Sequence, residues 1–180
     1  MHPTPNELEL VIDFVNTRDI EKSTDALAGD GLREWLESRG LLDAPGETLG
    51  ERERAQATRL REALRAVMLA NNGAPPDAHA GPELEGAASR GGLSVHFTAD
   101  GSASLAPAAP GFAGALARLL VPVAYSSSDG TWSRAKACRA PDCQWAFYDR
   151  SRNHSGVWCD MAVCGNRTKV RAYRGRKSGG

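Results

Sequence analysis

Apolar residues recur at helical spacing in four stretches of the first 130 residues. In residues 8–17, LELVIDFVNT, apolar positions 8, 11, 12 and 15 fit one helical face, while the β-branched content leaves a strand as the alternative; we favour a helix. Residues 31–40 predict a short helix that buries Leu32, Trp35 and Leu36 and stops at Gly40. Residues 112–125 predict a buried helix that Pro122 kinks or ends early.

The clearest helical pattern spans residues 48–72. Thr48 and Glu51 form a candidate capping box at its start. The apolar stripe of this helix comprises Leu60, Leu64, Val67 and Met68. Its arginines are interspersed with glutamates, so we expect them on the solvent-exposed face: Arg52, Arg54, Arg59, Arg61 and Arg65.

The remaining N-terminal pattern predicts a loop and a hairpin. Residues 73–92 are rich in Gly, Ala and Pro, which is typical of a loop. Apolar and polar residues alternate in residues 93–98, and the turn signal Asp100-Gly101 precedes residues 103–106, so a β-hairpin is expected. The predicted fold class is therefore α+β, mostly helical with one hairpin, ending near SSSDG at residues 126–130.

The net charge of zero conceals two oppositely charged parts. Residues 1–133 hold 11 Lys and Arg against 19 Asp and Glu, whereas residues 134–180 hold 11 against 3. All four cysteines lie in the basic part. We therefore predict two domains, an acidic one over residues 1–130 and a basic one over residues 131–180 that suits a polyanionic partner.

The chain carries no signal for a membrane or for secretion. No apolar run approaches the roughly 20 residues needed to span a bilayer. The polar, acidic N-terminus does not resemble a secretory signal, so a cytoplasmic location is expected. Thiols stay reduced in that compartment, and clustered cysteines then indicate metal or redox chemistry rather than disulfides.

The four cysteines form two pairs of equal spacing. Cys138 and Cys143 make one C-x4-C pair, and after fifteen residues Cys159 and Cys164 make another. Zn²⁺ takes four ligands in a tetrahedron, and two turns that each supply two thiolates can enclose it. A redox dithiol generally uses C-x-x-C instead. His154 is an alternative ligand, but four thiolates already fill the shell, so one structural zinc ion is expected.

Cations dominate the chain after the last cysteine pair. Asp160 is the only acidic residue in residues 160–177 and a candidate N-cap, so salt bridges within the predicted helix cannot neutralise its cations. Fixed cations would bind phosphates and release counterions, while a solubilising tail is the alternative. The candidate nucleic-acid contacts, which include two residues of the loop between the pairs, are Arg150, Arg152, Arg167, Lys169, Arg171, Arg174, Arg176 and Lys177.

The C-terminal third resembles the CGNR zinc finger, named for the tetrapeptide that stands here as residues 164–167. WAFYDRSRN at residues 145–153 also fits that family, and the opening LELVIDFVNT is similar to the start of the ABATE domain that usually precedes the finger. The resemblance implies zinc on the four cysteines, DNA contact near and after Arg167, and a regulatory N-terminal domain. Proteins of this kind are regarded as stress-induced transcription regulators. The family tends to be basic before the third cysteine, where this chain has HSGV at residues 154–157.

We expect a DNA-binding transcription regulator whose N-terminal domain responds to an unidentified small-molecule effector. A single finger is a small reader, so specificity calls for a homodimer or a second finger. The alternative is a zinc-braced module for RNA or protein, in which aromatic residues stack on bases if they are exposed; we expect them in the core: Trp145, Phe147, Tyr148 and Trp158. The chain has no HExxH, P-loop or Gly-x-Ser-x-Gly motif, so we expect neither an enzyme nor catalytic residues.

Overall fold

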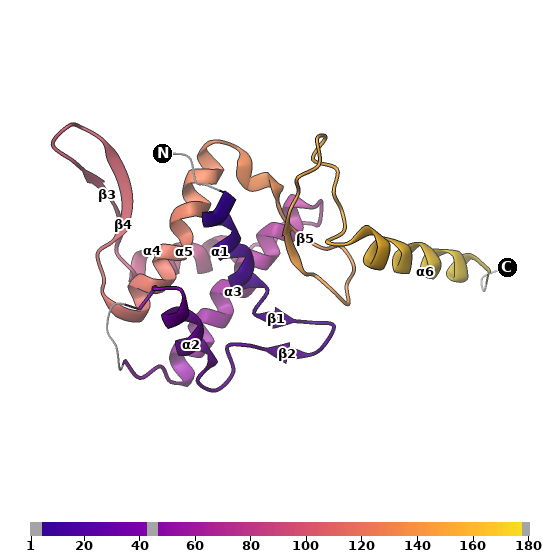
Figure 1. The fold of residues 1–180 in the computed structure, drawn as a ribbon, viewed down its shortest axis with the longest axis horizontal. Helices are drawn as coiled ribbons and strands as arrows, with labels where there is room; N and C mark the ends of the chain where they lie inside the picture. The colour runs from indigo at the N-terminus through magenta and orange to yellow at the C-terminus, as the bar shows by residue number, and fades with distance from the viewer. Residues whose placement is uncertain (1–4, 43–46, 178–180) are drawn as a thin grey trace.

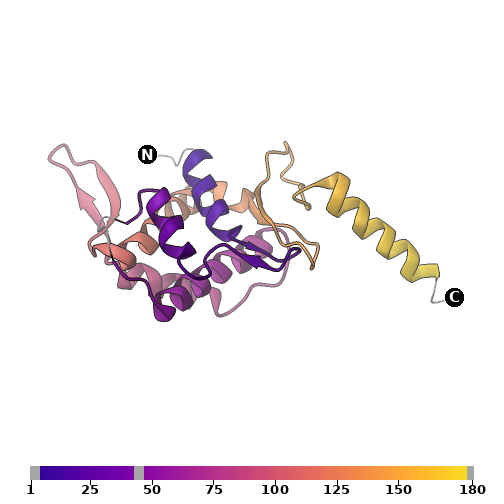
Figure 2. The same ribbon diagram turned by 60° about the horizontal axis from the view of Figure 1, so that its bottom comes forward.

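The computed structural model describes residues 5–42 and 47–177. Five helices form the body of the molecule, a β-hairpin projects from one end, and a long C-terminal helix projects from the other (Figures 1 and 2). The helices of the body are α1 (Pro5–Val15), α2 (Gly31–Ser38), α3 (Glu51–Asn71), α4 (Ala80–Arg90) and α5 (Gly111–Ser128). A helical body with small antiparallel strand pairs confirms the predicted α+β class.

Three of the four stretches with helical spacing form the helices α1, α2 and α5, and the fourth forms α3. In α1 the residues Val11, Phe14 and Val15 are fully buried, and the Phe14 ring lies 5.2 Å from that of Trp35 in α2. Pro122 does not end α5, which continues to Ser128. Because α5 is buried along most of its length, tertiary packing outweighs the backbone hydrogen bond that proline cannot make.

Residues 73–92 do not form the predicted loop, because they contain the helix α4. Pro82 lies in the first turn, where its missing N–H would have no partner in any case. The helix packs against α3 and α5, and a Cβ on Gly91 at its end would overlap with Ala117 of α5. The small residues that suggested a loop therefore serve close helix packing.

The cap of α3 also differs from the prediction. The backbone N–H of Gly50 donates to Glu53 Oε2 at 2.9 Å, and the helix begins at Glu51. Thr48 and Glu51 consequently do not form the capping box. Only one half of a capping box forms, two residues further along the chain, because Gly50 has the extended conformation of an N-cap residue but no side chain that could accept in return.

The predicted β-hairpin is confirmed as β3 (Leu93–Phe97) and β4 (Ala103–Pro107). Leu93 pairs with Pro107, Val95 with Leu105 and Phe97 with Ala103, so apolar residues share one face of the hairpin. This face is largely open to solvent, with Phe97 74% exposed. The hairpin is thus an arm attached to the helical body at its base (Figure 1).

Two arginines of α3 are buried rather than solvated. Arg61 and Arg65 are each 2% exposed. Arg61 forms a two-pronged ion pair with Asp25, at 2.7 and 2.9 Å, and thereby holds the short ribbon of β1 (Arg18–Asp19) and β2 (Thr24–Asp25) against α3. The prediction of a solvated face is wrong for these two residues. Segments distant in the sequence cover them and supply carboxylate and carbonyl oxygens that accept from their guanidinium groups.

Arg65 joins three parts of the chain through backbone oxygen atoms. Its guanidinium donates to the carbonyl of Val15 at 2.7 Å and to that of Gln144 at 2.8 Å, while Nε donates to Glu62 at 3.0 Å. Val15 ends α1, and Gln144 directly follows the second cysteine. One buried cation therefore fixes the first cysteine pair to the helical body.

The C-terminal segment (residues 131–177) begins inside the same hydrophobic core. A 3-10 turn (Thr131–Arg134) leads into a small hairpin of β5 (Ala135–Ala137) and β6 (Ala146–Tyr148). Trp132, Ala135 and Ala137 are buried with residues of α1 and α3. The hairpin carrying the first cysteines is thus packed onto the N-terminal helices.

Three asparagine side chains of the N-terminal helices hydrogen-bond this hairpin and the segment around it. Asn16 donates to the carbonyl of Ala146 at 2.9 Å and accepts from its N–H at 2.8 Å. Asn72 donates to the carbonyl oxygens of Ala137 and Val157, both at 2.8 Å. Asn71 donates to those of Trp132 and Ala135. These bonds satisfy backbone groups that burial removes from water.

Among the described residues, no helix has the length and apolar character that crossing a bilayer requires.

Replacing Arg65 by Met tests the role of the buried guanidinium. We expect the free energy of unfolding to fall by about 3 kcal/mol, because several buried carbonyl groups lose their donor. Urea denaturation of the zinc-loaded chain measures the change. Arg52 lies on the same helix and is exposed, so Arg52→Met is the matched control, with an expected change below about 0.5 kcal/mol. Equal effects of the two variants would contradict this role of Arg65.

Candidate metal centre and basic helix

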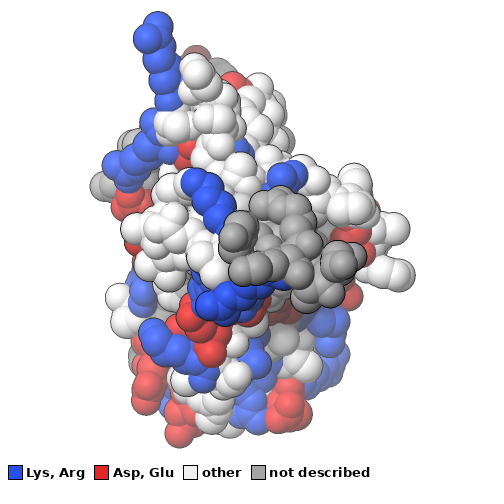
Figure 3. Space-filling model, turned by 90° about the vertical axis from the view of Figure 1, so that its right-hand side faces the viewer, with Lys and Arg blue, Asp and Glu red and all other residues white. Residues whose placement is uncertain are grey.

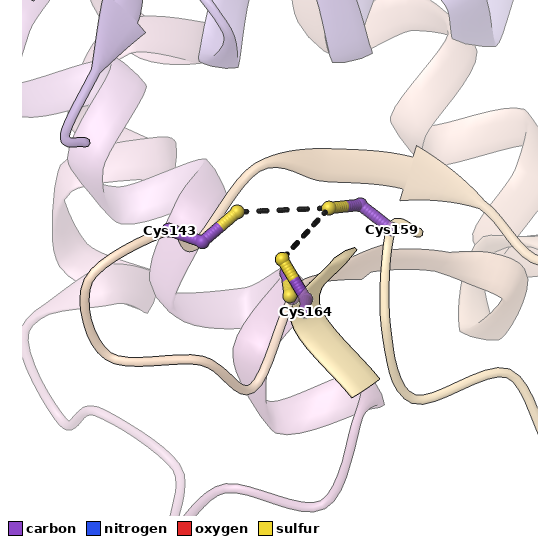
Figure 4. Close-up of side chains that lie close together, drawn as sticks. Cys143, Cys159 and Cys164 are labelled. Carbon is purple, nitrogen blue, oxygen red and sulfur yellow. Dashed lines mark hydrogen bonds between the residues drawn. The ribbon is translucent and has the colours of Figure 1, made fainter. Parts of the chain in front are cut away.

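The four cysteines converge from two turns that lie far apart in the sequence. The first cysteine turn (residues 138–143) follows β5 and closes with a hydrogen bond from the N–H of Cys143 to the carbonyl of Ala140 at 2.9 Å. The second cysteine turn (residues 159–164) leads into the C-terminal helix. All four Sγ atoms lie within 4.8 Å of one another, and Figure 4 shows three of them pointing at a common centre.

The sulfur geometry fits a tetrahedral zinc ion. With Zn–S bonds of about 2.3 Å, the sulfur atoms of a tetrahedron lie about 3.8 Å apart. The Sγ of Cys159 lies 3.6 Å from that of Cys143 and 3.8 Å from that of Cys164. The four predicted ligands are therefore close enough to coordinate one zinc ion. Four thiolates fill its coordination shell, which is typical of a structural site.

Burial raises the pKa of the Cys143 thiol to about 11, and it also raises the pKa of Cys159. Both sulfurs therefore carry protons at neutral pH when no metal is bound. Zinc binds thiolates, so binding must displace these protons. The affinity of the site for zinc consequently falls as the pH falls.

The second cysteine turn is built by Asp160 and a wide helical turn. Asp160 Oδ1 accepts from the N–H groups of Ala162 at 2.7 Å and Val163 at 3.2 Å, which confirms the predicted N-cap. A π-helical turn (Met161–Gly165) follows and continues as α6 (Asn166–Lys177). The metal turn and the basic helix are thus one continuous helical element.

The tetrapeptide at residues 164–167 has a local structural explanation at each position. A Cβ on Gly165 would overlap with Met161 Sδ and lie 3.1 Å from the Trp158 ring, so only glycine fits without rearrangement. The Asn166 side chain donates to the carbonyl of Ala162 at 3.0 Å. Arg167 Nη2 lies 3.4 Å from the Sγ of Cys164, where an N–H donor stabilises a metal-bound thiolate.

Arg167 also joins α6 to two acidic side chains from outside the helix. Its two terminal nitrogens donate to the carboxylate of Glu21 at 2.8 and 3.2 Å, and Nη1 lies 3.2 Å from Asp142. These hydrogen bonds, foremost those to Glu21, raise the pKa of Arg167 above its usual range. Glu21 belongs to the turn between β1 and β2, so Arg167 connects the metal centre with the N-terminal part of the chain.

On this end of the molecule, side chains of Lys and Arg lie interspersed with those of Asp and Glu (Figure 3). Arg171 pairs with Asp142 at 2.8 Å and Arg150 pairs with Glu9 at 3.0 Å. Arg152, Lys169 and Arg174 are exposed. The side chains of Arg176 and Lys177 lie outside the described part of the structure.

The sequence pattern did not reveal these acidic partners. Helical spacing tests only residues three or four positions apart, whereas Glu9, Glu21 and Asp142 lie in other segments. The acidic excess of residues 1–133 was the one signal that pointed to Glu9 and Glu21, and Asp142 lies outside that range. The cations nearest the metal centre are therefore less free than the sequence suggested.

The loop between the cysteine pairs is held by a buried ion pair. Lys136 Nζ lies 2.7 Å from Asp149 Oδ2 and donates to the carbonyl of His154 at 2.6 Å. Burial opposes ionisation of Asp149, but its hydrogen bond from Lys136 keeps the pKa of this carboxyl below the usual value. The His154 ring contacts Arg134 and does not join the sulfur cluster.

The aromatic residues of the C-terminal segment are less buried than predicted. Phe147, Tyr148 and Trp158 are half-buried, and Trp145 is 38% exposed. Of the expected aromatic core around the metal, only Trp158 packs against the cysteines, while Tyr148 packs against the core that includes α1 and α3. Trp145 lines a surface hollow of about 250 Å³ that separates it from the turn carrying Glu21.

Metal analysis of the purified chain tests the centre, and we expect one zinc ion per chain. Cys143→Ser and Cys159→Ser each remove a thiolate, so zinc retention during dialysis against a chelator should fall sharply. Ser155→Ala, an exposed substitution in the loop between the pairs, is the control and should retain full occupancy. A zinc content well below one in the unmodified protein would exclude the metal centre.

Two family models cover nearly the whole described chain. The model described as "CGNR zinc finger" matches residues 134–177, which contain all four cysteines. The ABATE model, described as "Putative stress-induced transcription regulator", matches residues 8–129. No curated protein matches the chain. The chain therefore belongs to the ABATE family and ends in a CGNR zinc finger.

Proposed function

We propose that the protein is a DNA-binding transcription regulator that contacts duplex DNA through α6. The observation that carries this proposal is the placement of the helix, which projects from the body while the metal centre fixes its first turn (Figure 2). The family description supports the regulatory role. The N-terminal helices would position the finger and respond to a signal, which requires no enzymatic activity.

The dimensions and charge of α6 suit the major groove. Its 12 residues extend over about 18 Å, and a helix of ordinary diameter fits that groove. Lys169, Arg171 and Arg174 are exposed along it. Cations held on a fixed helix bind phosphates and release counterions, so the affinity should depend strongly on salt.

Arg152 extends the basic surface into the loop between the cysteine pairs. The Lys136–Asp149 pair orders this loop, and it thereby limits the conformational entropy that binding would remove. One finger of this size presents few base contacts, so we propose that selective binding uses a homodimer. We also propose that a small molecule binds the N-terminal part as an effector.

A second candidate function is binding of single-stranded RNA. It is favoured by Trp145, whose partly exposed ring could stack on an unpaired base. The acidic side chains beside this ring, Asp19 and Glu21, weigh against a polyanion at that position. Duplex DNA at α6 is therefore the leading proposal.

Replacing Lys169, Arg171 and Arg174 together by Ala tests the proposed surface. Because the variant removes three cations that would each bind a phosphate, we expect duplex affinity at low salt to fall by at least tenfold. The slope of log K against log salt should shrink by about 3 for the same reason. Fluorescence anisotropy over a salt series measures both quantities.

A charge-matched control is the triple variant Arg52→Ala, Arg59→Ala and Arg90→Ala, which removes three exposed cations from α3 and α4. It should leave the salt slope nearly unchanged. If the two triple variants behave alike, duplex binding does not use α6. A preference of the native protein for single-stranded RNA over duplex DNA would favour the second candidate.

A further inference from the structure

We propose that Glu21 and Asp142 occupy the phosphate-binding edges of Arg167 and Arg171, and that a DNA backbone phosphate displaces Glu21 when the protein binds. This inference rests on the proposed function and adds a regulatory contact to it. In the structure the Glu21 carboxylate stands in for that phosphate on Arg167.

The geometry of Glu21 on Arg167 is that of a bidentate anion. Two carboxylate oxygens accept from two terminal nitrogens at 2.8 and 3.2 Å. A phosphate diester also presents two anionic oxygens, and arginine binds carboxylate and phosphate in the same forked manner. The position of Glu21 on the guanidinium therefore marks where a phosphate would bind.

Asp142 connects the two arginines of this surface. Its Oδ2 lies 3.2 Å from Arg167 and 2.8 Å from Arg171, while Oδ1 accepts from Arg171 at 3.1 Å. Asp142 belongs to the first cysteine turn, so it is fixed relative to the metal centre. It orients both guanidinium groups and cannot leave as readily as Glu21.

Glu21 can leave Arg167 because the turn that carries it contacts this arginine through an exposed ion pair and borders a surface hollow. The Glu21 side chain is 51% exposed, and exposed ion pairs contribute little stability. A hollow of about 250 Å³ lies between this turn and the side chains of Trp145 and Val163. Displacement of Glu21 therefore breaks an ion pair without opening the hydrophobic core.

Arg167 would keep its orientation after the exchange. Its Nη2 remains beside Cys164 Sγ, and Asp142 remains beside Nη1. The two terminal nitrogens of Arg167 then face the incoming phosphate from a fixed position. The ribbon of β1 and β2, held at Asp25 by the buried Arg61, becomes the element that covers or uncovers this edge.

Glu21→Gln in the full-length, zinc-loaded protein tests the inference. Loss of the carboxylate should tighten duplex binding roughly two- to fivefold at about 0.1 M salt, because one exposed ion pair no longer competes. The slope of log K against log salt should stay nearly unchanged, since Arg167 contacts the same phosphate in both complexes. Anisotropy titrations over a salt series give both values.

Two further variants separate local competition from a general change of charge. Glu85→Gln removes the same charge from an exposed site on α4, at the other end of the molecule, and should leave the duplex affinity nearly unchanged (Figure 1). In an Arg167→Gln background with verified zinc content, Glu21→Gln should no longer change the affinity, because the shared cation is absent.

The inference is overturned if Glu21→Gln and Glu85→Gln act alike, or if Glu21→Gln weakens binding, which would make Glu21 a support of Arg167 rather than a competitor. Either result would leave duplex binding by the native protein intact. Failure of the native protein and of all three variants to bind any duplex would instead remove the proposed function, and this inference with it.

Discussion

The attachment of the first cysteine turn to the N-terminal helices is the constraint on which the rest of the structure depends. Arg65 reaches the carbonyl of Gln144 from α3, and Asn16 pairs with the backbone of Ala146. A segment of 47 residues has too little apolar surface to hold four sulfurs in place by itself. The helices provide the surface on which this turn is formed, and the zinc ion then joins it to the second turn.

The metal centre has its main effect on α6. Because Cys164 lies in the turn that continues into this helix, binding of zinc fixes both the start and the direction of the basic surface. Arg167 also attaches α6 to other segments, since it contacts a ligand sulfur, the first cysteine turn and Glu21 at once. Metal, helix and N-terminal ribbon are therefore linked electrostatically rather than by extensive packing.

Features encoded by local spacing could be predicted from the sequence, whereas features that depend on distant partners could not. The helices α1, α2, α3 and α5 follow from apolar periodicity, and the metal ligands follow from two equal cysteine spacings. Arg61 and Arg65 have the same local pattern as the exposed Arg52, so only the folded chain separates them. The helix α4 was missed because glycine and proline lower helix propensity, although they permit close packing here.

The asparagine contacts have a consequence for how such proteins can be recombined. The two family matches meet between residues 129 and 134, which looks like a natural point at which to exchange fingers between relatives. Asn71 and Asn72 lie on one side of that point, and the carbonyl groups of Ala135 and Ala137 lie on the other. A transplanted finger therefore keeps these hydrogen bonds only where its new N-terminal segment supplies equivalent donors. An exchange at this junction therefore has to preserve the asparagine contacts that cross it.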